Sequence, residues 1–196
     1  MWKESIECIK RRFWQWDFFR LPVWVGDSLY LLEQTSDWPG VGDLSMRLSD
    51  TNLIKDMVVV EQAAYQGLLP WDARDLLYDM TQNKDAFYIQ ALVDYNLVAF
   101  IGLRRDLRDV HISNLVVLPE YQSQSIGHRL LEQAVHCAKL LDRQSLSLEV
   151  RASNYGAQRF YRRHGFNFGA SKSNYYLDNH EDAIIMTLEW EQSDED

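Results

Sequence analysis

The sequence is poor in cysteine and has no long apolar run. Its two cysteines, Cys8 and Cys137, are too few for a disulfide framework, and neither lies in the Cys and His spacing of a metal site. No apolar stretch approaches the roughly 20 residues that cross a bilayer, and residues 1–5 carry no apolar signal-peptide core. We therefore expect a cytoplasmic protein with no metal and a buried, inert Cys137.

Basic residues are also scarce. Lys and Arg number 20 against 29 Asp and Glu, so the net charge is -9. Without a basic excess to attract phosphates, we expect no direct nucleic-acid partner and no membrane partner. Hydrophobic residues at 46% and charged residues at 25% are typical of a globular protein, and 196 residues suffice for one domain of roughly 150 residues plus an extension.

Composition changes near residues 39–42, where Pro-Gly-Val-Gly separates two segments. Five of the seven tryptophans precede this point: Trp2, Trp14, Trp16, Trp24 and Trp38. One interpretation is a short helix and an extended chain whose aromatic side chains cover the main domain; the other is a contact with a partner or a second copy. We predict an aromatic-rich extension over residues 1–43, a catalytic domain over 44–190 and an acidic tail over 191–196.

Strand and helix patterns alternate after residue 43. Alternation of Leu44, Met46 and Leu48 with polar residues predicts a strand, and a helical period of apolar residues predicts a long helix over 125–141. The other predicted elements are a helix from Asp50 to 65, a short helix after Asp72, a hairpin of 87–92 and 97–103, strands at 111–118, 145–151, 166–173 and 183–190, and a helix at 154–164. This order predicts an α+β fold with helices packed on a sheet.

The turn between strand 111–118 and helix 125–141 has the sequence Gln-Ser-Gln-Ser-Ile-Gly over residues 122–127. Backbone N–H groups at a turn and a helix N-terminus are unpaired, and the helix dipole adds positive potential, so a pyrophosphate fits there without a lysine. A strand, turn and helix with one glycine is common, so this pattern alone is a weak indication of function.

A second segment, residues 148–166, contains several chemically active side chains. By pattern alone, Glu149 is a solvated carboxylate on the polar side of a strand, Tyr161 is a core tyrosine, and Asn154 caps a helix. The arginines Arg159, Arg162 and Arg163 form a solvated helix face by the same reasoning.

Together, however, the two segments resemble motifs A and B of the GCN5-related N-acetyltransferase (GNAT) superfamily, in the right order and with the right helix between them. Segments 149–154, 174–176 and 181–186 are similar to its RimI-type branch, whose members acetylate the N-terminal alanine of ribosomal protein S-18. The resemblance is strong over residues 111–188 and weaker over 44–110. It implies a GNAT fold with a mixed, mostly antiparallel sheet, acetyl-CoA as cosubstrate and a ribosomal protein N-terminus as acceptor.

The resemblance also implies roles for individual residues. Glu149 matches the family's proton acceptor and Tyr161 its proton donor, and Tyr175 and Tyr176 would contact the substrate N-terminus. The acetyl-CoA would be held by Leu115, Val116 and Val117 along the pantetheine, by Ser123, Gln124, Ser125, Ile126, Gly127 and His128 around the pyrophosphate, and by Asn154. Ser125 replaces the first motif A glycine, so we expect it to adopt a glycine-compatible conformation and to offer its hydroxyl to the phosphates.

The implied reaction is direct aminolysis of a thioester. Glu149 would remove the amine proton through one water, which needs a pKa raised only modestly. The N–H near Val117 would stabilise the oxyanion, and Tyr161 would protonate the thiolate. Two alternatives are a family member that acetylates lysine or small amines, and a non-catalytic CoA-binding module. The Tyr pair favours a peptide N-terminus, and the nearby Asp178, Glu181 and Asp182 would attract a basic substrate tail.

Overall fold

The computed structural model describes residues 23–25, 28–30, 34–38, 41–49, 51–65 and 71–190. The strands are β1 (Val23–Val25), β2 (Ser28–Tyr30), β3 (Gln34–Trp38), β4 (Gly42–Leu48), β5 (Ala86–Val93), β6 (Asn96–Arg105), β7 (Asp109–Val117), β8 (Ser145–Arg151), β9 (Asn167–Tyr176) and β10 (Glu181–Glu189). The helices are α2 (Ile54–Ala64), α3 (Ala73–Gln82), α4 (Ile126–Leu140) and α5 (Tyr155–Arg163), with short 3-10 turns at Thr51–Leu53 and Pro119–Tyr121.

Eight of these strands form one sheet in the order β3-β4-β5-β6-β7-β8-β10-β9. Every neighbouring pair in it is antiparallel except β7 and β8, which run parallel because α4 connects them as a crossover. The mixed, mostly antiparallel sheet expected from the sequence is confirmed.

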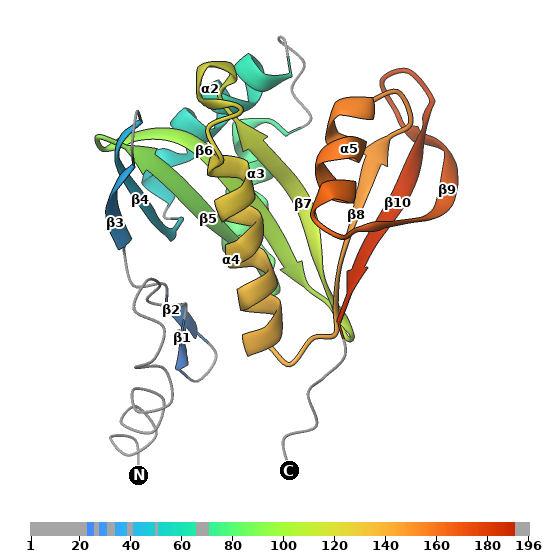
Figure 1. The fold of residues 1–196 in the computed structure, drawn as a ribbon, viewed down its shortest axis with the longest axis horizontal. Helices are drawn as coiled ribbons and strands as arrows, with labels where there is room; N and C mark the ends of the chain where they lie inside the picture. The colour runs from blue at the N-terminus through green and yellow to red at the C-terminus, as the bar shows by residue number, and fades with distance from the viewer. Residues whose placement is uncertain are drawn as a thin grey trace.

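Helices cover both faces of the sheet (Figure 1). Helices α4 and α5 pack on one face, where Leu130, Leu146 and Tyr161 belong to one buried cluster. Helices α2 and α3 pack on the other face, where Met57 and Leu76 belong to a second cluster. Within the ranges that the structure describes, no helix is long and apolar enough to cross a membrane.

Local signals in the sequence explain where these helices begin and end. Asp72 caps α3 by accepting from the backbone N–H groups of Arg74 and Asp75, and Asn154 caps α5 by accepting from Ala157 at 3.0 Å. Gly165 follows α5 with φ of 87°, the left-handed conformation that ends a helix. Cys137 is fully buried in α4, as predicted.

Strands β7 and β8 separate after a short paired stretch. Their parallel pairing covers only Asp109 to His111 of β7, opposite Ser145 to Ser147 of β8, although both strands continue. Just beyond, the β6–β7 register shifts at Ser113, the extra residue of a β-bulge, and a bulge bends its strand. The ribbons of β7 and β8 lie close together at one end and diverge toward the other (Figure 1). A stretch of β7 edge is thus left without a β8 partner.

Part of the predicted N-terminal extension joins the sheet. Strand β3 pairs with β4 from Gln34 opposite Met46 to Trp38 opposite Gly42, and β1 and β2 form a separate hairpin. The predicted first helix, the tryptophan side chains of residues 1–38, the Asp50 cap and the acidic tail all lie outside the described residues.

Candidate active site

The turn over residues 122–127, named here the donor turn, has a left-handed backbone at two places. Ser123 has φ of 62° and Ser125 has φ of 64° with ψ of 6° at the N-cap of α4. The prediction that Ser125 keeps a glycine-compatible conformation is confirmed. Alternating left-handed residues turn successive N–H groups to one side, and this concave backbone suits an anion at a helix N-terminus.

Side-chain amides hold the donor turn in place. Gln122 donates to the carbonyl of Val117 at 3.1 Å, and Gln124 donates to the carbonyl of Glu120 at 2.7 Å. Ile126 is buried, so of this residue only the backbone is available to a ligand. A Cβ at Gly127 would lie 3.5 Å from Val117 and 3.7 Å from Phe160, which means that the helix start packs closely on β7 and α5.

The stretch of β7 that has no β8 partner lies directly before the donor turn. Leu115, Val116 and Val117 all follow the last β7–β8 register pair at His111. Their other edge is fully paired with β6, from Val117 opposite Ala99 to Leu115 opposite Ile101. On this edge the Val117 carbonyl accepts from Gln122, and the other backbone groups that face away from β6 have no β8 partner to prevent pairing with an extended ligand. Pairing with the pantetheine stays a prediction.

Tyr161 projects from α5 into the core. It is 8% exposed and packs against Phe160 and Phe166, with ring centroids 5.2 and 5.3 Å away. Burial raises the pKa of its hydroxyl, so Tyr161 keeps its proton. It belongs to the same cluster as Leu148 and Val150, on the α4 face of the sheet.

Glu149 lies between Leu148 and Val150 and so points to the opposite face. Its side chain is 12% exposed and accepts from Lys172 Nζ at 2.7 Å, while His111 Nε2 lies 3.1 Å from its other oxygen. Hydrogen bonding to His111 lowers the Glu149 pKa to about 2, against the opposing effect of burial, and Lys172 lowers it further. The expectation of a raised pKa is wrong, because the sequence pattern did not reveal these two partners.

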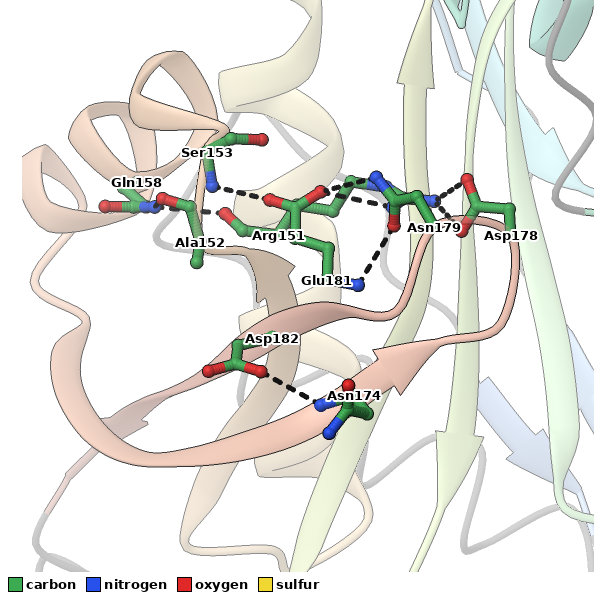
Figure 2. Close-up of polar contacts among 9 residues, drawn as sticks. All are labelled: Arg151, Ala152, Ser153, Gln158, Asn174, Asp178, Asn179, Glu181 and Asp182. Atoms are coloured by element: carbon green, nitrogen blue, oxygen red, sulfur yellow. Dashed lines mark hydrogen bonds and ion pairs between the residues drawn. The ribbon is translucent and has the colours of Figure 1, made fainter.

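Arg151, two residues further along β8, anchors the turn between β9 and β10 (Figure 2). It binds both carboxylate oxygens of Asp178 at 2.9 and 3.0 Å, binds Glu181 at 3.3 Å, and stacks under Tyr176 with 3.8 Å from guanidinium carbon to ring centroid. A planar guanidinium is suited to such bidentate and stacked contacts. Arg151 therefore fixes the position of Tyr176.

The acidic residues of this turn are engaged within the chain. Glu181 accepts from the Ser153 N–H at 2.7 Å. Hydrogen bonding from the Ser153 side chain, and then from this N–H, lowers the pKa of Glu181 to about 2. Asp182 accepts from the Asn174 N–H at 2.9 Å (Figure 2). With Asp178 paired to Arg151, the charge available to attract a basic substrate tail is smaller than the sequence suggested.

Comparison with known proteins gives the same picture as the geometry. A sequence model described as the acetyltransferase (GNAT) family matches residues 54–166, more than half of the chain. The chain belongs to this family. A Bacillus subtilis (strain 168) protein that carries a provisional name, [ribosomal protein bS18]-alanine N-acetyltransferase, is 35% identical over 142 residues, which are 72% of this chain and 91% of that protein.

Two further similarities concern Escherichia coli. The [ribosomal protein bS18]-alanine N-acetyltransferase of strain K12 is 34% identical over 66% of this chain and 86% of its own length. The crystal structure of the E. coli ribosomal-protein-S18-alanine N-acetyltransferase superposes with a TM-score of 0.69 at 29% identity, covering 78% of this chain and 97% of that one. This GNAT chain is an acetyl-CoA-dependent N-acetyltransferase of the RimI type.

The remaining predicted residues of the GNAT site have partners of their own. His128 Nδ1 lies 2.7 Å from His164 Nε2, linking α4 to α5 beside the donor turn. Asn154 uses its carbonyl oxygen to cap α5, which leaves its amide N–H groups for a ligand. Tyr175 and Tyr176 meet edge to face with centroids 5.2 Å apart, so the predicted pair lies together on the Glu149 side.

Sequence reasoning missed a buried carboxyl group beneath this site. Glu61 of α2 is fully buried and accepts from Asn114 Nδ2 of β7 at 3.2 Å. Burial raises its pKa to about 7. It follows Ile54 by seven residues and Met57 by four, which places it on the buried stripe of α2; a charged residue on an apolar stripe was the available signal.

Proposed function

We propose that this acetyltransferase transfers the acetyl group of acetyl-CoA to the N-terminal α-amine of ribosomal protein S-18, in the cytoplasm. The observation that carries the proposal is similarity to proteins named for this reaction over about nine tenths of their length. The open β7 edge, the donor turn and the Glu149 side of the sheet supply the two halves of a site for it.

The acetyl-CoA half of the site follows from backbone geometry. The pyrophosphate binds the N–H groups of Ser123 to His128, and the pantetheine pairs with the β7 edge over residues 115–117. This arrangement carries the thioester into the gap between β7 and β8. There the N–H near Val117 stabilises the developing oxyanion, and Tyr161, which keeps its proton, protonates the departing thiolate.

The acceptor half lies on the other side of the gap. Lys172 Nζ sits 2.7 Å from Glu149 and 5.1 Å from the centre of the Tyr175 ring, so carboxylate and ring together hold an alkylammonium. The substrate α-ammonium displaces Lys172 from this position. Because an α-amine has a pKa of about 7.7–8.0, much of it is protonated at neutral pH, and Glu149 starts the transfer by taking a proton, directly or through one water.

Two alternative functions remain to be distinguished from this one by experiment. The first is acetylation of lysine or small-molecule amines, because the same ammonium position also accommodates them. The second is a CoA-binding module without catalysis, for which the replacement of the first motif A glycine by Ser125 is the evidence. The left-handed backbone of Ser125 and the presence of both Glu149 and Tyr161 favour an active enzyme.

One assay with three peptide arms separates these functions. The arms are a peptide copying the S-18 N-terminus, the same peptide with its α-amine blocked and its lysines free, and a variant without lysine. With acetyl-CoA present, we expect acetylation of the first and third at the α-amine, located by fragmentation mass spectrometry. Acetylation of only the lysine-containing arms would establish the lysine function, and binding of acetyl-CoA without transfer to any arm would establish the non-catalytic one.

A further inference from the structure

A chain of polar side chains crosses β7 and β8 where the two strands are still paired. His111 lies opposite Ser147 in the register, and both are on the same face as Glu149. His111 Nδ1 is 3.0 Å from Ser147 Oγ, and Ser147 donates in turn to Asp109. His111 Nε2 is 3.1 Å from Glu149. The proton acceptor expected from sequence is therefore the end of a longer network.

Counting hydrogens fixes the tautomer of His111. The Ser147 hydroxyl has one hydrogen and donates it to Asp109, so its oxygen is left to accept from His111 Nδ1–H. An ionised carboxylate can only accept. Nε2 of His111 therefore either carries a second proton, which it donates to Glu149, or presents its lone pair to the carboxylate and holds a vacant proton position beside it.

We infer that the proton removed from the acceptor amine comes to rest on His111 Nε2, with Glu149 as the carboxylate that passes it on. This inference rests on the proposed function and adds the final proton acceptor. Glu149 faces Lys172 Nζ with one carboxylate oxygen and His111 Nε2 with the other, so a proton taken up on the Lys172 side can be passed to His111 on the other side.

Charges of both signs surround His111. Asp109 and Glu149 stabilise the imidazolium, and Arg104, its register partner on β6, and Lys172 of β9 oppose it. From α2, Glu61 binds Asn114, three residues further along β7. The side chain is only 15% exposed, so its neighbours are weakly screened by solvent.

The protons balance without any further reactant. The ammonium loses two protons when it becomes an amide: the N–C bond forms, the C–S bond breaks, one proton ends on the CoA sulfur and one leaves to solvent. His111 Nε2 takes the first proton, which frees the nitrogen lone pair to attack the thioester. Tyr161 gives its proton to the sulfur and recovers a proton through the second one that the nitrogen loses. His111 releases its proton to solvent after the amide has left, and the enzyme returns to its starting state.

The pH profile of acetyl transfer tests this assignment. Because the ammonium binds and passes its proton to neutral His111, log(kcat/KM) for wild type should rise with a limiting slope of about one at low pH and fall again above the amine pKa of about 7.7–8.0. His111→Gln should lower kcat/KM by about a hundredfold, and its profile should rise to this pKa without a fall above it, because the substrate amine must then lose its proton to solvent. His136→Gln, on α4 outside the site, is the control and should keep the wild-type profile.

A second measurement needs no substitution. Nitrogen NMR of the wild-type imidazoles should show His111 protonated at Nδ1 throughout, with Nε2 as the titrating atom. It also guards against a His111→Gln variant that fails to fold. A neutral tautomer protonated at Nε2 would overturn the inference.

The outcomes separate this inference from the proposed function. Transfer to the α-amine, with an alkaline fall in wild type that is lost in His111→Gln, supports both. Transfer with the same pH profile in wild type and His111→Gln overturns the role of His111 and leaves the proposed function intact. No transfer by wild type to any amine overturns both, whatever the tautomer of His111.

Discussion

The donor turn acts through its backbone, whereas the region around Glu149 acts through side chains. The donor turn offers backbone N–H groups, and its essential property is the left-handed φ at Ser123 and Ser125. Around Glu149, by contrast, side chains from three strands meet: His111 from β7, Glu149 itself from β8 and Lys172 from β9. The first region should therefore tolerate changes of side chain that keep its conformation, whereas the second should tolerate almost none.

Glu149→Gln should give the largest effect and separates the two regions most clearly. The amide cannot take a proton, so kcat/KM for an S-18 N-terminal peptide should fall by about 10²–10⁴-fold. Because the donor turn is untouched, the Kd for acetyl-CoA from calorimetry should stay at the wild-type value. Loss of acetyl-CoA binding in this variant would show that the regions are not independent.

Tyr161→Phe tests the proposed proton donor on the α4 face of the sheet. The value of kcat should fall by about a hundredfold, because the leaving thiolate loses its proton donor. The buried ring keeps its packing against Phe166, so the unfolding midpoint should change little. Tyr155→Phe is the matched control, since Tyr155 is an exposed tyrosine on the same helix. Unchanged kcat in Tyr161→Phe would remove Tyr161 from the mechanism.

Glu61→Gln extends the comparison to α2, which packs on the same face of the sheet as Asn114 of β7. The folded protein keeps the Glu61 proton up to about pH 7, whereas the unfolded chain releases it near the ordinary value of 4.5. Wild-type stability should therefore fall as pH rises through this window, and the variant should lack this fall. At pH 8 urea unfolding should show Glu61→Gln more stable by on the order of 2 kcal/mol. Parallel stability profiles would contradict the raised pKa.

The smallest effect is expected at the donor turn. A β-branched residue in the left-handed region costs about 1–2 kcal/mol, so Ser125→Val should weaken acetyl-CoA binding by about tenfold in calorimetry. Ser125→Gly, which keeps the conformation without a side chain, should bind as wild type does or more tightly. Equal affinity of the Val variant would mean that backbone conformation does not set the strength of this site.

Local patterns in the sequence were sufficient to predict most elements. Alternation predicted β8 with the bounds that the structure has, and helical period predicted α4 to within one residue at each end. The Asn154 cap and the Gly165 stop also follow from residues near in sequence. Each of these patterns depends on a few residues that are close in sequence, and the elements that they predict are present in the folded structure.

Long-range contacts could not be predicted in this way. The pairing of Glu149 with Lys172 joins residues 23 apart, and that of Glu61 with Asn114 joins residues 53 apart. The Ser113 bulge depends on the register between β6 and β7, which alternation along one strand does not determine. The direction of the Glu149 pKa was wrong for the same reason, since it is set by neighbours on other strands.

The central claim is that the acetyl group passes directly from acetyl-CoA at the donor turn to the peptide amine beside Glu149. A rapid-quench single-turnover experiment tests this claim most directly. Enzyme loaded with acetyl-CoA labelled in the acetyl group is mixed with an S-18 N-terminal peptide, and the label is followed on CoA, protein and peptide. The account predicts that label leaves CoA and reaches the peptide α-amine with one rate constant, with none on the protein. Burial raises the pKa of the Cys137 thiol to about 12, consistent with that course. Label passing through an acetylated protein side chain before the peptide would contradict it.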